Sequence, residues 1–131
     1  MEIASQEVIR VASDWIMAGH ARNGPLLASL SEELDPLSVF TFASASNSNL
    51  TLQELLGHLT DVIPCPVTES KPSGFQEGDL AWVVDNPNVD IPAAGKTSIR
   101  ITVVLHRSGG EWRVVHGHLS EGVDHAEANL A

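Results

Sequence analysis

The sequence has little of what disulfide-rich, nucleic-acid-binding and membrane proteins need. Its single cysteine, Cys65, has no partner for an intramolecular disulfide, and its proline-flanked position predicts a semi-buried thiol. Seven basic against 17 acidic side chains give a net charge of −10, which disfavours nucleic acid and anionic membranes as partners. No apolar run approaches the ~18 residues of a membrane span, and the first residues lack a signal-peptide pattern. We therefore expect a soluble, cytoplasmic protein with no nucleic-acid and no membrane partner.

What the sequence does contain is typical of a globular chain. Hydrophobic residues make up 43% and charged residues 18% of its 131 positions, which favours a folded core over disorder. The acidic residues are scattered, and no internal repeat or low-complexity tract divides the chain. Because this length suits one core, we expect a single domain over residues 1–131.

The first half of the chain predicts helices. Ser5 is a suitable N-cap for a helix whose apolar residues recur at helical spacing as far as Ala18. An Asn–Gly–Pro turn ends this helix, and Pro25 opens a second, short one. Thr51 caps a third helix, which Pro64 stops.

The second half predicts β structure, preceded by one strand over residues 37–44. Further strands are expected over residues 79–85, 97–107 and 112–122, with a loop over residues 86–96. A Gly–Gly turn joins the last two strands as a hairpin. Helices first and an antiparallel meander second argue for an α+β domain, with the helices on one face of a curved sheet.

Alternation along the last two strands assigns each of their residues to one face of the sheet. The face toward the helices should be apolar, because the helices present stripes of leucine and tryptophan. It is predicted to hold Ile99, Ile101, Val103, Leu105, Val115, Gly117 and Leu119. The opposite face is predicted to hold Arg100, Thr102, Val104, His106, Trp112, Val114, His116, His118 and Ser120. We expect a second subunit to cover this opposite face, unless a β-bulge shifts the register.

The closing segment, RITVVLHRSGGEWRVVHGHLS, is similar to the SnoaL-like branch of the nuclear transport factor 2-like (NTF2-like) superfamily, which includes the calcium/calmodulin-dependent kinase association domain. The segment GDLAWVV resembles another strand of the same family. The resemblance extends over about residues 5–122. Its motif residues are Gly78, Asp79, Ala81, Trp82, Arg100, Thr102, Gly110, Trp112, His116, His118 and Ser120.

This resemblance implies a cone-shaped α+β barrel, in which N-terminal helices pack on a strongly curved antiparallel sheet and enclose a pocket. It also implies a homodimer that forms through the opposite sheet face, and a small apolar organic ligand. The expected pocket residues are Trp15, Phe40, Phe42, Trp82, Val103, Val115, Gly117 and Leu119. Gly117 is expected to leave space beside it for a cavity. The expected interface residues are Arg100, Thr102, Trp112, His116, His118 and Ser120.

The resemblance leaves the chemistry open, because the superfamily includes both enzymes and binding or assembly domains. The chain has no tyrosine, so the phenolic oxyanion donor of ketosteroid isomerases is missing. The strand around Phe40 carries no carboxylate as a general base, which leaves Asp14 on the first helix as a weak acid–base candidate. His116 and His118 alone make a weak metal site, so we predict neither metal nor cofactor.

Three functions follow from these features. The first is a protein that binds a small molecule in an apolar pocket between helices and sheet. The second is an isomerase, cyclase or dehydratase that acts on a polyketide-like or steroid-like substrate. The third is an association domain that assembles through its histidine-bearing sheet face.

Overall fold

Three helices form where the sequence supplies both caps and apolar stripes. A computed structural model describes residues 1–32, 40–42, 49–60, 63–92 and 95–121. The helices are α1 (Gln6–His20), α2 (Gly24–Ser29) and α3 (Leu52–Leu59). The Ser5 hydroxyl accepts the Val8 N–H in the first turn of α1, and Thr51 and Glu54 form a reciprocal capping box on α3. The backbone N–H of Thr51 lowers the pKa of Glu54, because it donates to the ionised carboxylate.

Nine strands are described. They are β1 (Glu2–Ile3), β2 (Phe40–Phe42), β3 (Asn49–Leu50), β4 (Val67–Thr68), β5 (Ser73–Glu77), β6 (Leu80–Asp85), β7 (Asn88–Ile91), β8 (Gly95–Ser108) and β9 (Glu111–Glu121). Their order is β1-β5-β6-β8-β9-β2-β3, and β7 pairs with both β4 and β8. The pairs are antiparallel except that β2 runs parallel to β9.

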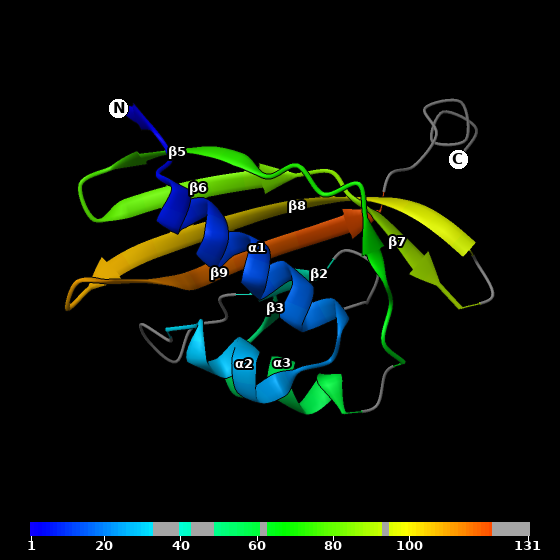
Figure 1. Ribbon diagram of the computed structural model, residues 1–131. Helices are drawn as coiled ribbons and strands as arrows, with labels where there is room; N and C mark the ends of the chain where they lie inside the picture. Colours follow the sequence, from blue (N-terminus) through cyan, green and yellow to red (C-terminus); the bar gives the residue numbers. More distant parts are fainter. Residues whose placement is uncertain (33–39, 43–48, 61–62, 93–94, 122–131) are drawn as a thin grey trace.

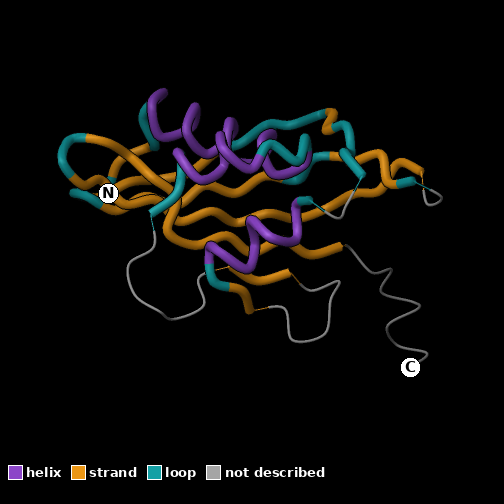
Figure 2. Tube along the Cα trace, turned by 90° about the horizontal axis from the view of Figure 1, so that it is seen from below, coloured by secondary structure: helices purple, strands orange, loops and turns teal. Residues whose placement is uncertain are grey.

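The sheet is strongly curved, and the helices lie against one side of it. Figure 1 shows α1 crossing the long strands, with α2 and α3 together beside β2 and β3. Figure 2 shows the same layers from below, with the helices against the strands. The predicted fold class, helices packed on a strongly curved sheet, is confirmed.

The two sides of the sheet differ sharply in exposure. We call the side against the helices the inner face; on β6, β8 and β9 it includes Ala81, Val83, Ile101, Val103, Leu105 and Val114, each at most 3% exposed. We call the opposite side the outer face; it includes Phe75, Leu80, Trp82, Val84, Val104 and His106. The inner face and the apolar stripe of α1 form the core.

Two parts of the sheet differ from the predicted elements. The segment expected as a loop over residues 86–96 contains β7, which pairs with β8 at the end of the sheet. A register shift between Val104 and Leu105 pairs them with His116 and Val114, so Val115 is an extra residue in β9.

Among the residues described, no helix is long and apolar enough to cross a membrane.

Candidate functional site

Trp15 occupies the centre of the space between α1 and the sheet. The tip of its indole ring meets the backbone of Gly117 on β9, where an added Cβ would lie 2.7 Å from Trp15 Cη2. Its Nε1–H donates to the Ser31 hydroxyl at 2.9 Å, and that hydroxyl donates to the Leu27 carbonyl at 2.6 Å. Gly117 therefore makes room for the tryptophan ring itself. The expectation that Gly117 leaves an open space is wrong.

Four leucines that pack against the core are only partly covered. Leu119 lies two residues after Gly117 on the inner face of β9 and is half-buried. Leu30 caps the C-terminal end of α2, Leu50 is in β3 and Leu56 is in α3, and all three are also half-buried. The chain therefore leaves part of the surface of these leucines open.

The remaining predicted pocket residues fall into three groups. Val103 is fully buried on the inner face, next to Gly117 across the strands. The backbone of Phe40 and Phe42 pairs with Gly117 and Leu119 in β2, but their side chains lie outside what the structure describes. Trp82 is on the outer face, paired with Val104, so its prediction as a pocket wall is wrong. Its ring instead contacts Phe75, with centroids 5.8 Å apart.

The β-bulge also corrects the predicted faces on β9. Because β9 gains one residue there, Trp112 and Val114 lie on the inner face, opposite Arg107 and Leu105. Trp112 is 5% exposed, belongs to the core, and carries the Arg107 guanidinium 5.0 Å above its ring. The expectation that Trp112 and Val114 share the face of the histidines is therefore wrong.

Val115, the extra residue, is buried but is not a member of the described core cluster. Its prediction as an inner wall rested on strict alternation, which the bulge breaks.

Beyond the bulge, the predicted outer row is in place. His116, His118 and Ser120 pair with Val104, Thr102 and Arg100 across β8 and β9, all on the outer face. His118, Thr102 and Arg100 are exposed, and His116 and Ser120 are half-buried. Their role in an interface stays a prediction.

Asp14 lies on the solvent side of α1. Its carboxylate pairs with Arg10 one turn earlier at 3.5 Å, and its side chain is 50% exposed. The two residues border an open surface groove of about 380 Å³, whose floor includes Ile9 and Pro72. Asp14, the weak acid–base candidate of the sequence, is therefore an exposed helix residue with an ion-pair partner.

A second titratable group lies at the end of α1. Burial lowers the pKa of His20, against the opposing effect of its Nδ1–H bond to the Ile16 carbonyl at 2.8 Å; the charge of Arg22 lowers it further. Arg22 also donates to the Cys65 sulfur at 3.7 Å, and that thiol is buried as expected. The imidazole of His20 thus satisfies a carbonyl in the last turn of α1, and burial favours its neutral form.

The buried carboxylate of Asp85 is fully engaged in structure. It accepts hydrogen bonds from the Ser70 hydroxyl and from the backbone N–H groups of Lys71 and Asn86. These bonds hold the turn before β5 against the end of β6 and offset the cost of burying the charge.

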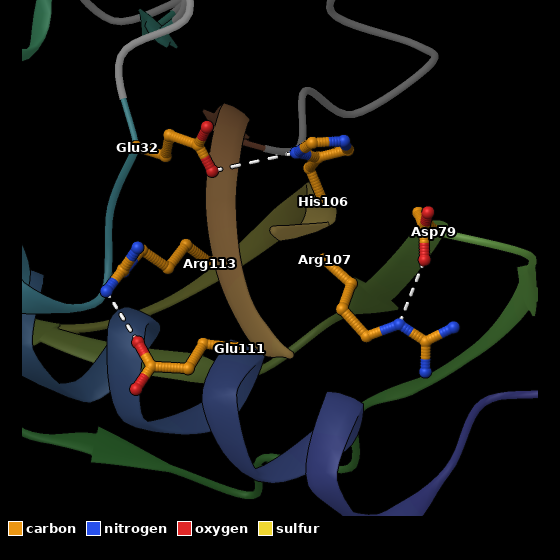
Figure 3. Close-up of polar contacts among 6 residues, drawn as sticks. All are labelled: Glu32, Asp79, His106, Arg107, Glu111 and Arg113. Atoms are coloured by element: carbon orange, nitrogen blue, oxygen red, sulfur yellow. Dashed lines mark hydrogen bonds and ion pairs between the residues drawn. The ribbon is translucent and has the colours of Figure 1, made fainter. Parts of the chain in front are cut away.

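Glu32 and His106 meet on the outer face, and sequence reasoning did not anticipate this pair. Glu32 Oε2 lies 3.6 Å from His106 Nδ1, and Figure 3 shows the carboxylate reaching across β9 to the imidazole on β8. Both atoms are closed off from solvent and lack a hydrogen-bond partner among the residues described. Arg113 lies directly opposite His106 and pairs with Glu111. Arg107 and Asp79 form a further ion pair at 3.0 Å.

Metal-ligating side chains do not form a cluster among the described residues. Within the described ranges, no three His, Cys, Asp or Glu residues are placed to hold a metal ion together. The arrangement offers apolar contact on the inner face and the three polar pairs of Figure 3.

Comparison with known proteins finds a partial family match and a shared fold. Residues 69–124 match the SnoaL-like domain family. No curated protein matches the sequence. An NTF2-like protein of unknown function from Pseudomonas putida is similar in structure, with a TM-score of 0.68 and 19% identity over 90% of this chain and 86% of that one.

Two further solved structures show the same fold. A ketosteroid isomerase-like protein from Erwinia carotovora atroseptica has a TM-score of 0.68 and 17% identity, over 92% of this chain and 100% of that one. A cystatin-like fold protein from Burkholderia xenovorans has a TM-score of 0.68 and 15% identity, over 95% and 98% of the two chains. At these identities the likeness concerns the fold.

Proposed function

We propose that this chain, which joins a SnoaL-like sequence over residues 69–124 to the cystatin-like fold of NTF2-like proteins, binds a small apolar organic molecule beside Trp15. The observation that carries the proposal is that Leu119, two residues after the Gly117 that meets the Trp15 ring, is only half-buried, as are Leu30, Leu50 and Leu56 from α2, β3 and α3. A ligand that covers apolar surface left partly open by the chain lowers the free energy of the system.

Binding rather than proton transfer is favoured by the state of the acidic groups. Asp14 is exposed and paired with Arg10, and the Asp85 carboxylate already accepts three hydrogen bonds. A general base must reach the proton that it abstracts, and neither carboxylate is free to do so inside the core. An isomerase, cyclase or dehydratase is the second candidate, because two structural neighbours carry a ketosteroid isomerase description.

The test is calorimetric titration with progesterone, a neutral steroid, on the native chain and two variants. Gly117→Ala places a methyl group against the Trp15 ring and should weaken binding, because the ring must move. Leu80→Ala, on the exposed outer face, is the matched control and should leave binding unchanged. Equal affinity in all three proteins, or no heat of binding in any, contradicts the proposal.

The second candidate has its own readout. The chain is incubated with 5-androstene-3,17-dione, and formation of the conjugated enone is followed by ultraviolet absorbance. Turnover that Asp14→Asn and His20→Gln both leave intact would remove these two residues as acid–base groups. Turnover of any kind would replace simple binding as the main function.

We also propose that two copies associate through the outer face. Large apolar side chains are exposed there, with Phe75 at 45%, Leu80 at 55% and Val84 at 46%. Basic and imidazole side chains gather on the β8–β9 half of this face, at Arg100, His106, Arg113, His116 and His118. In a chain of net charge −10, this is a face on which two copies can approach with less repulsion.

Light scattering after size exclusion tests this association. Val84→Lys places a charge on the outer face and should shift the chain from dimer to monomer. Met17→Lys, on α1 and also 46% exposed, is the control and should leave the dimer intact. A monomeric native chain, or loss of the dimer in both variants, contradicts the association.

A further inference from the structure

A short segment after α2 links the interior to the outer face. Two backbone hydrogen bonds attach this segment to Val114 of β9. The Val114 N–H donates to the Leu30 carbonyl at 2.8 Å, and the Glu32 N–H donates to the Val114 carbonyl at 2.9 Å. Ser31 lies between them in a parallel bridge to Val114. Since alternate residues of an extended segment point to opposite sides, Ser31 faces inward and Glu32 outward.

Each of these two neighbours holds a different partner. Ser31 accepts the Trp15 indole N–H at 2.9 Å and is 8% exposed. Glu32 reaches across β9 to His106 on β8, where the two facing atoms are 3.6 Å apart and sealed from solvent (Figure 3). A single peptide bond therefore separates the residue that pairs with His106 from the residue that holds the Trp15 indole.

We propose that the Glu32–His106 pair positions Trp15 through Ser31, and that protonation of His106 holds the Trp15 ring more firmly in place. A protonated imidazole adds a positive charge beside the carboxylate and draws Glu32 closer, which fixes Ser31 more firmly on the edge of β9. With a neutral imidazole, the buried carboxylate has weaker compensation and the segment is held less tightly.

The surroundings of His106 make its effect specific to this pair. Across β9 the opposing residue is Arg113, which is engaged by Glu111, and across β6 the opposing residue is the apolar Leu80. Among the described residues around His106, Glu32 from the segment after α2 is the carboxylate that faces the imidazole, and Arg113 of β9 is the cation beside it. The next titratable group on the outer face of β9 is His116, which pairs with Val104.

The test follows the Nε1–H signal of Trp15 by nitrogen-15 NMR, with the signal assigned by its loss in Trp15→Phe. Between pH 8 and pH 5, the range over which histidines change charge, the signal of the native chain should shift. The shift should be lost in His106→Gln and in Glu32→Gln. It should persist in Glu111→Gln, which breaks the neighbouring pair, and in His20→Gln, which removes the histidine on the same helix as Trp15.

Two results overturn the proposal: a native signal that does not move, or a shift that His106→Gln retains. A structural role alone would lower the melting temperature of Glu32→Gln without removing the pH dependence of the Trp15 signal. The effect on progesterone affinity rests on the proposed function, so it is measured separately at both pH values. Absence of steroid binding would refute the proposed function and leave the NMR result to decide this inference.

Discussion

The inner and outer faces of β6 and β8 are built from alternating residues of the same strands, yet they differ in almost every physical respect. Leu105 on the inner face is fully buried, whereas Leu80, one strand away on the outer face, is 55% exposed. Trp15 and Trp112 are in the core, whereas Trp82 lies outside with Phe75. The inner face forms the core of the fold, and the outer face leaves large apolar side chains exposed.

The difference teaches that residue type alone does not separate the two roles in a small curved sheet. Both faces carry large apolar residues. Hydrophobicity therefore predicts that each face is covered, but it does not predict whether the chain's own helices or another molecule covers it. The helices of the chain itself cover the inner face. On the outer face, Val84 remains 46% exposed, which is the basis of the proposed association.

The largest expected effect is at the best-covered position of the inner face. Leu105→Ala should lower the free energy of unfolding by about 2–5 kcal/mol, because it leaves a cavity in the core. Leu80→Ala, the same change on the outer face, should cost only about 0.5 kcal/mol. Urea unfolding of both variants measures the difference. Similar losses would mean that the two faces are equally covered.

The next effect concerns the contact between Gly117 and Trp15. Gly117→Ala should cost about 1–3 kcal/mol, because the new methyl group overlaps the indole ring and forces it to move. Gly57→Ala in α3 is the matched control, since its Cβ meets no atom within 4 Å, and it should stabilise the chain slightly. Thermal unfolding compares the two, and a neutral Gly117→Ala would show that the ring is not held against the strand.

A smaller effect follows from His20 at the inner edge of α1. Burial lowers its pKa below the ordinary value of 6.5, so in acid the unfolded chain binds a proton that the folded chain does not. The free energy of unfolding should therefore fall as the pH drops below about 6.5. His20→Gln should flatten this dependence in urea unfolding at several pH values. A stability that rises on acidification in the native chain, and not in His20→Gln, would reverse the assignment.

The smallest effect is expected on the outer face of β9. His118 is exposed, so His118→Ala should change the free energy of unfolding by less than about 0.5 kcal/mol. The same urea measurement, made on the monomeric Val84→Lys background, separates folding from association. A large loss there would place His118 in the folded core rather than at its surface.

Much of the fold could be predicted from the sequence, because helix caps, apolar stripes and alternation are local signals. Ser5 and Thr51 begin helices where expected, and β8 and β9 form the predicted hairpin. Strict alternation failed at Val115, because a β-bulge depends on how two strands fit together and not on either strand alone.

The site was harder to predict for the same reason. Trp82 was expected in the pocket from the family resemblance, but the pairing of β6 with β8 places it on the outer face. Ser31 and Glu32 carry no motif, and their roles depend on the bridge to Val114, which is 83 positions away from Ser31. The isolated polar residues after Leu30 were the available sequence signal, and many surface turns share it.

The central claim, that an apolar molecule binds beside Trp15, is most directly tested by fluorescence of a chain in which Trp15 is the sole tryptophan. Trp82→Phe and Trp112→Phe remove the other two indoles, and progesterone is titrated into this variant. The account predicts a saturable change in Trp15 emission, with the same midpoint as in calorimetry of the native chain. Calorimetric binding without any change in Trp15 emission would place the ligand elsewhere and contradict the account.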